Sequence, residues 1–201
     1  DDDSLDTDNG WQGHIQFAIV VQRANGGDNM TEASSAGTAV VPPSNPMISN
    51  FTFVARAGGG NGFRLNTGTV GRYINGVLFE QGDECMRYQP DAGNGTAGFQ
   101  GIGTDPSFTS VLFDCAGGLA TGNSDAAAAT GAVNADPNNV VGPNSLTGTF
   151  INGANETAVT AVDPNGIDAW FQTAQYAGAV QNNQDRWWAG WSCGLEAASP
   201  C

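Results

Sequence analysis

Five aspartates stand within the first eight residues, and they form the densest group of side chains in this chain that could perform chemistry. Calcium prefers oxygen ligands, and the spacing in residues 6–10 resembles half of a calcium loop whose closing glutamate is missing. Paired carboxyl groups could instead act as general acid and base in the hydrolysis of a glycosidic bond. A solvated acidic turn is the plainer interpretation, because acidic runs are commonly just surface. The candidate calcium ligands are Asp3, Asp6 and Asp8, and the candidate catalytic carboxyl groups are Asp2, Asp3 and Asp6.

Arg64 and Arg87 form the one cationic pair that the sequence places side by side. They occupy matching positions in the repeat described below, so we expect them to face outward on adjacent turns. Two guanidinium groups in this arrangement repel each other unless an anion lies between them. The anion could be the side chain of Glu84 or Asp91, in which case the arginines have a structural role. It could instead be the carboxylate of a uronic acid. Both arginines are therefore candidate catalytic groups for a reaction on an acidic polysaccharide.

Three tryptophans, Trp187, Trp188 and Trp191, gather near the end of the chain. Large aromatic side chains cover open cores and edge strands well. They could also stack on the apolar faces of sugar rings, although aromatic side chains are more often simply buried. We expect these tryptophans to cap the C-terminal end of the fold.

The overall charge excludes several classes of partner. The chain has 201 residues, with 20 acidic and 6 basic side chains and a net charge of −14 at pH 7. This charge repels phosphate backbones, so nucleic acid is not expected as a partner. The sequence contains no run of apolar residues long enough to span a membrane. A composition rich in glycine and free of lysine suits an extracellular protein.

Four cysteines allow three disulfide pairings, and the sequence alone does not choose among them. We expect Cys85 to pair with Cys115, joining neighbouring turns, and Cys193 to pair with Cys201 at the chain end. His14 is the single histidine, which leaves too few soft ligands for zinc or iron. Calcium is therefore the one candidate cofactor.

Four β-rich segments recur along the chain and would position all of these groups. They span residues 15–23, 48–56, 73–81 and 107–115, at offsets of 33, 25 and 34 residues, and each leads into a turn rich in glycine or asparagine. Repeats of this length are typical of a solenoid, in which each turn buries its apolar face only on its neighbours.

The offsets also predict which residues lie above one another. Asn50, Asn75 and Thr109 would form a polar ladder, because similar side chains at a strand spacing of about 4.8 Å can hydrogen-bond along a stack. On the second strand of each turn, Phe63 would lie above Met86 in the core.

Several of these segments carry a family resemblance. Residues 1–8, 16–22, 49–54 and 188–191 resemble the C-terminal part of large secreted bacterial proteins of pectin-lyase-like shape. The resemblance covers nearly the whole chain, and it implies a right-handed parallel β-helix that is secreted or held at the cell surface. It implies no agreed catalytic set, although an arginine can abstract the proton in lyases of this shape. Such proteins usually have further turns before the Asp-rich segment, so we expect either a processed chain or a first turn that is open to a partner.

The expected fold class is all-β, a right-handed parallel β-helix of five or six turns with an irregular aromatic C-terminal cap. The whole chain would form one solenoid domain. Residues 1–115 would supply regular turns, 116–146 a low-complexity surface excursion, 147–162 the last turn and 163–201 the cap.

The leading functional hypothesis is a structural one, an extracellular surface protein. Its open N-terminal turn would stack on another copy, head to tail, and self-association would build a fibre. A hydrolase or lyase that acts on acidic polysaccharide is the first alternative, and the scarcity of proton-transfer groups counts against it. A calcium-dependent adhesion or glycan-binding module is the second.

Overall fold

The computed structural model describes residues 2–35, 41–66, 68–88, 106–120, 126–190 and 192–195. Its strands are β1 (Leu5–Thr7), β2 (His14–Val21), β3 (Thr31–Ala33), β4 (Met47–Val54), β5 (Phe63–Leu65), β6 (Arg72–Glu80), β7 (Met86–Tyr88), β8 (Ser107–Thr109), β9 (Leu112–Cys115) and β10 (Val140–Val141). Its helices are α1 (Ala126–Asn134), α2 (Ala154–Thr157) and the short 3-10 helix η1 (Pro164–Gly166).

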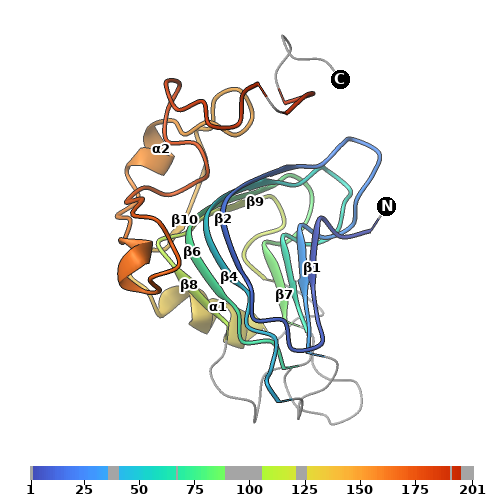
Figure 1. Cartoon of the computed structure of the whole chain (residues 1–201). Coiled ribbons are helices and arrows are strands. Elements are labelled where there is room, and N and C mark those ends of the chain that lie inside the picture. Colours follow the sequence, from blue (N-terminus) through green and yellow to red (C-terminus); the bar gives the residue numbers. More distant parts are fainter. Residues whose placement is uncertain are drawn as a thin grey trace.

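The strands form two parallel sheets, and from β1 to β8 the chain visits them alternately (Figure 1). The small sheet has the order β1-β3-β5-β7, and the large sheet has the order β10-β9-β6-β4-β2, with β8 also paired to β6. Every pairing between these strands is parallel. The all-β parallel coil is therefore confirmed. In the described part of the chain the small sheet stacks four strands and the large sheet stacks five, which corresponds to four or five turns, against the five or six predicted.

The register confirms two of the three predicted offsets. Ile15 pairs with Ile48 and Ile48 pairs with Tyr73, at offsets of 33 and 25 residues. Tyr73 pairs with Phe108, however, so the third offset is 35 residues and not 34. On the small sheet, Phe63 pairs with Met86 as predicted.

The slip of one residue removes Thr109 from the predicted ladder. Thr109 pairs with Ile74, so Ser110 follows Asn75 in the stack. Asn50, Asn75 and Ser110 all have positive φ, at 50°, 51° and 57°, a conformation that asparagine tolerates better than most residues. The two asparagines make no hydrogen bond to each other, because both donate outward to the carbonyl of Ala174.

The interior between the two sheets is filled by aromatic rings. Phe63 contacts Phe51, Tyr73 and Phe108, with ring centroids 6.0, 4.7 and 5.2 Å away, and all four side chains are buried. Gly76 lies opposite Phe51 in the next strand, and a Cβ there would come within 1.9 Å of the Phe51 ring. Glycine at this position is what lets the large ring fit inside the coil.

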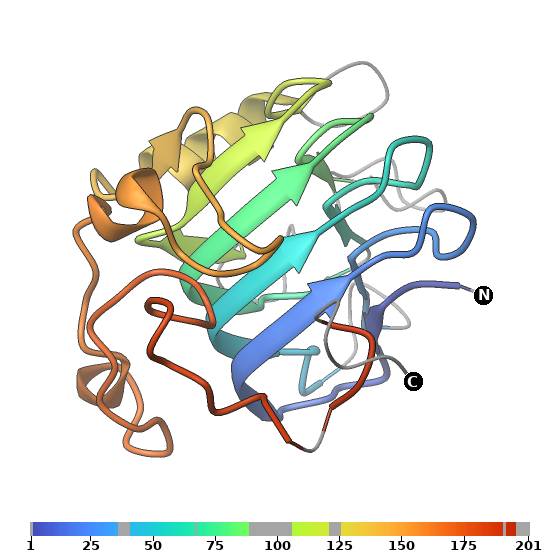
Figure 2. The same cartoon turned by 90° about the horizontal axis from the view of Figure 1, so that it is seen from above.

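Helix α1 closes the coil at its last turn (Figure 2). The helix packs against β7 and β8, and its Ala129 and Val133 side chains are buried in the same core as Phe108. The prediction that residues 116–146 are a surface excursion is wrong for this part, because alanine is the strongest helix former and the apolar face of α1 finds the open core.

The C-terminal segment crosses the outer face of the large sheet (Figures 1 and 2). Phe150 and Trp188 form a cluster there that packs against Ile19 and Val21 of β2, and Trp187 contacts Phe17. The predicted cap on the last turn is not confirmed, because α1 occupies that place. Trp191 lies outside the described residues. The predicted last turn at 147–162 is wrong, since that stretch holds α2 and isolated bridges.

The predicted disulfide between neighbouring turns of the coil is confirmed. Cys85 is bonded to Cys115, which joins the start of β7 to the end of β9. Cys193 is also disulfide-bonded, and its predicted partner Cys201 lies outside the described residues. Among the described residues, no helix has the length and apolar character needed to cross a membrane.

Candidate functional site

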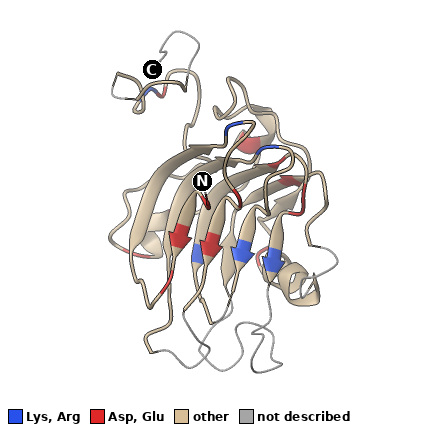
Figure 3. Ribbon diagram, turned by 90° about the vertical axis from the view of Figure 1, so that its right-hand side faces the viewer, with Lys and Arg blue, Asp and Glu red and all other residues tan. Residues whose placement is uncertain are grey.

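Four charged residues lie side by side on the outer face of the small sheet. Asp6 pairs with Glu32, Glu32 with Arg64, and Arg64 with Arg87, one from each strand. Each is the middle residue of a three-residue strand, so the strand alternation directs it outward while its neighbours face the core. In Figure 3, two neighbouring strands carry a segment coloured red for acidic residues, and the next two carry one coloured blue for basic residues. We call these four residues the charged row.

Glu32 contacts several side chains from its place in the charged row. Its Oε2 lies 3.3 Å from Nη1 of Arg64, and its Oε1 accepts a hydrogen bond of 2.8 Å from the amide of Asn66. Its carboxyl group also hydrogen-bonds to that of Asp3. The Glu32 side chain is 23% exposed, so the carboxyl is largely removed from water but remains reachable from outside.

The surroundings of Glu32 raise its pKa from 4.5 to about 7. Burial is the largest cause, and the hydrogen bond to Asp3 adds to it, while Arg64 acts in the opposite direction. The pKa of Asp6 is also raised, first by burial and then by the charges of Asp3, Asp8 and Asp2. Glu32 thus holds a proton near neutral pH beside an arginine, which is the state a proton donor needs.

The raised pKa makes stability depend on pH in a defined direction. Between pH 4.5 and about 7 the unfolded chain releases the Glu32 proton while the folded chain keeps it, so folding stability falls as pH rises through this window. We expect Glu32→Gln to remove a decline on the order of 1–3 kcal/mol. Urea unfolding of wild type and variant across this range measures it. Stability curves that run parallel would show that Glu32 titrates normally in the folded protein.

The acidic cluster assembles differently from the prediction. Asp2, Asp3 and Asp28 can bring one carboxylate oxygen each within 4.8 Å of one another, and Asp28 was missed because it joins only through the stacking of turns. Asp3 already accepts two hydrogen bonds of 2.8 Å from Asn29, and Asp2 and Asp28 are exposed. Three carboxylates suit a hard cation, but exposed acidic groups often gather without one. Calcium at Asp3, Asp6 and Asp8 stays a prediction.

The arginines are aligned as predicted, but their carboxylate partner differs. Arg64 pairs with Glu32 of the preceding turn, whereas the carboxylate of Glu84 faces the Asn61 amide at 3.5 Å. Asp91 lies outside the described residues. Arg87 has a buried Nε that finds no hydrogen-bond partner among the described residues.

A sequence signal for Glu32 was present. Residues 29–32 match residues 61–64 in position within the turn, and this match places Glu32 in line with Arg64. Of the consecutive aspartates at the start of the chain, only Asp6 stands in the charged row.

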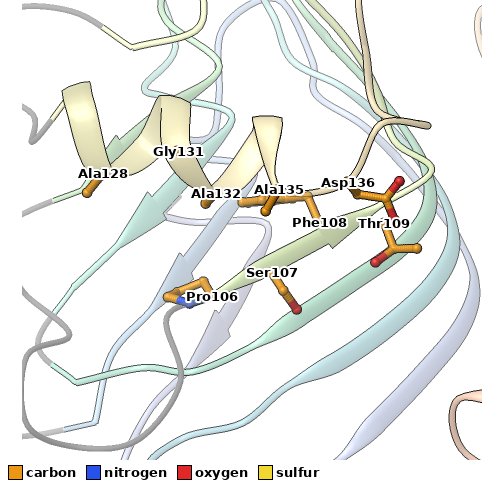
Figure 4. Close-up of a pocket in the computed structure, with 9 residues that line it drawn as sticks. All are labelled: Pro106, Ser107, Phe108, Thr109, Ala128, Gly131, Ala132, Ala135 and Asp136. Atoms are coloured by element: carbon orange, nitrogen blue, oxygen red, sulfur yellow. The ribbon is translucent and has the colours of Figure 1, made fainter.

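A cavity lies elsewhere in the described part of the chain. It has a volume of about 490 Å³ and lies between α1 and β8 (Figure 4). Small side chains line most of it, and its one charged residue, Asp136, accepts a hydrogen bond from the Asn138 backbone. A cavity with one carboxylate and no second ionisable group lacks the pair that acid–base chemistry requires.

The parallel coil agrees with a comparison to known families. A family described as the pectate-lyase-like β-helix domain matches residues 1–192, so the chain belongs to this family. No curated protein and no solved structure matches the chain.

Proposed function

We propose that this domain acts on an acidic polysaccharide, which lies across the outer face of the small sheet and is hydrolysed there. The observation that carries the proposal is the charged row, in which a proton-holding carboxyl stands beside Arg64, and Arg87 is aligned with Arg64 on the next strand. Arginine matches carboxylates with two parallel hydrogen bonds, so a polymer of uronic acids suits this surface.

The proposed chemistry follows from the position of each group. Glu32 donates its proton to the leaving glycosidic oxygen as the C–O bond breaks, and water supplies the new hydroxyl at the anomeric carbon. Asp6 on the adjacent strand is the second carboxyl, which takes the proton from that water. Arg64 and Arg87 hold the uronate carboxylates. The net charge of −14 repels such a polymer at long range, so the local pair of arginines must supply the attraction.

We further infer a right-handed coil and a secreted protein. Crossovers between parallel strands in one sheet are right-handed in about 98% of cases, and the same sterics favour that hand here. The Cys85–Cys115 disulfide supports an oxidising compartment.

Product assays on defined substrates test the hydrolytic function. Polygalacturonate and alginate should yield new reducing ends with wild type, and Glu32→Gln should lower the rate by about 100-fold or more, the usual contribution of a positioned proton donor. Asp185→Asn, at a partly buried acidic residue of the C-terminal segment, is the matched control and should retain the wild-type rate. Unsaturated products would identify elimination in place of hydrolysis, and no product on any acidic glycan would refute the enzymatic proposal.

A second candidate function is stacking of another β-helical turn on the first one. β1 and β2 are edge strands, and the inward side chains of Leu5, Ile15 and Val20 are only partly buried there. An edge of this kind can template further strands. Because α1 covers the other end, a head-to-tail fibre would require α1 to move, so association through the first turn alone is better supported. Sedimentation over a range of concentrations tests it, and a monomer throughout would exclude it.

A further inference from the structure

A tryptophan in the C-terminal segment has an exposed side chain. Trp170 is 56% exposed, whereas the adjacent Phe171 is buried. The indole stacks on the imidazole of His14, with ring centroids 5.1 Å apart and planes 25° apart. The Phe171 ring meets both rings edge-on, with centroids 5.5 Å away. These contacts fix the orientation of the indole while much of its surface remains in water.

Polar groups stand beside this exposed ring. Oδ2 of Asp168 lies 3.4 Å from Nε2 of His14, and Oδ1 accepts a hydrogen bond of 2.9 Å from the Trp170 backbone. That backbone bond, together with His14 and the charge of Arg72, lowers the pKa of Asp168 although desolvation opposes them. The Asp168 side chain is 38% exposed, so it offers charged acceptor oxygens to a bound molecule.

A rigid, exposed indole beside a carboxylate suits both the apolar patch and the hydroxyl groups of a sugar ring. The axial C–H groups of a pyranose form an apolar patch that suits an aromatic plane, and its hydroxyl groups suit a fixed acceptor. We propose that Trp170, His14 and Asp168 form a binding platform for a neutral pyranose unit of a glycan. The sugar stacks on the indole of Trp170 and donates a hydroxyl to Asp168. A neutral sugar is favoured because the Asp168 carboxylate repels a uronate.

This platform is separate from the charged row. It lies on the large sheet, where His14 begins β2, whereas the charged row lies on the small sheet. The proposal therefore does not depend on the hydrolytic function. The sequence hypothesis assigned sugar stacking to Trp187, Trp188 and Trp191. Of these, Trp188 is 3% exposed and lacks an open face, and Trp191 lies outside the described residues.

The competing explanation is that Trp170 only anchors the C-terminal segment to β2. Both explanations predict some loss of stability when the indole is removed, so stability alone does not separate them. Binding of a sugar and protection of the indole by that sugar do separate them.

Calorimetric titration with neutral hexasaccharides of glucose, xylose and mannose tests the platform. We expect wild type to bind at least one of them, with an affinity about tenfold or more higher than that of Trp170→Ala. Trp170→Phe should retain part of the affinity, and Val141→Ala, which alters another exposed apolar side chain, should retain all of it. The bound sugar should also protect tryptophan fluorescence from acrylamide quenching.

Two results would overturn the proposal. One is the absence of binding by wild type to all three hexasaccharides, and the other is equal affinity of wild type and Trp170→Ala. If Trp170→Ala fails to fold, Asp168→Asn decides the matter, because it keeps an acceptor for the Trp170 backbone. This variant should bind more weakly than wild type with its fold intact, and unchanged affinity in it would refute the role of the carboxylate.

Discussion

Replacing Asn75 with alanine is expected to lower the free energy of unfolding by about 3–4 kcal/mol. The Asn75 side chain donates to the carbonyls of Val162 and Ala174, at 2.8 and 3.1 Å, and accepts from the Val162 backbone at 3.1 Å. Alanine would leave those groups unpaired in a buried place. It would also have to adopt a φ of 51°, which costs about 1 kcal/mol outside glycine and asparagine.

Two variants separate these causes. Asn75→Gly accepts the positive φ and loses only the hydrogen bonds, so its loss of stability should be about 1 kcal/mol smaller than that of alanine. Urea unfolding measures both, with Asn165→Ala, an exposed residue of the C-terminal segment, as the comparison. An alanine variant as stable as wild type would show that Asn75 does not tie the C-terminal segment to the large sheet.

Removal of the Cys85–Cys115 disulfide is the second large effect. The bond joins positions separated by 30 residues, and a cross-link over such a loop stabilises by about 2–4 kcal/mol, chiefly by restricting the unfolded chain. The double variant with alanine at both positions should therefore unfold at a lower urea concentration. Cys193→Ala, which removes a disulfide near the chain end, should cost less. Coinciding urea midpoints for the double variant and wild type would contradict this account.

The coil could be predicted from the sequence because apolar side chains alternate along each strand, and this alternation is compatible with one register of strand pairing. A shift of one residue would turn every inward side chain outward, so offsets of 33 and 25 were well determined by the alternation. The third offset failed for a specific reason. The letters Val-Leu-Phe occur at 77–79 and again at 111–113, which suggests 34, but Val77 pairs with Leu112. Val111 is thereby placed in the interior, opposite the space that Gly76 leaves.

The parts that were missed depend on contacts between distant residues. The alanines of α1 carry no amphipathic pattern strong enough to show that they seal a core. The C-terminal segment is held by single asparagine side chains, such as Asn50, which donates to carbonyls at residues 174 and 176. Nothing local in the sequence indicates which carbonyls those amides will meet.

The candidate site was predicted in part. Repeat matching aligned Arg64 with Arg87, and the acidic start supplied Asp3 and Asp6. Glu32 was missed because its raised pKa arises from burial and from Asp3 of the preceding turn, neither of which a single stretch of sequence displays. The raised pKa of Glu32 thus depends on contacts between turns of the coil and not on a local sequence motif.

NMR titration of the Glu32 carboxyl carbon, with and without an oligogalacturonate, tests the central claim most directly. We predict a titration midpoint of about 7 in the free protein. The added negative charge of the bound oligosaccharide should move that midpoint upward. A midpoint near 4.5 that the oligosaccharide leaves unchanged would contradict both the protonation of Glu32 and the assignment of the charged row as the polysaccharide site.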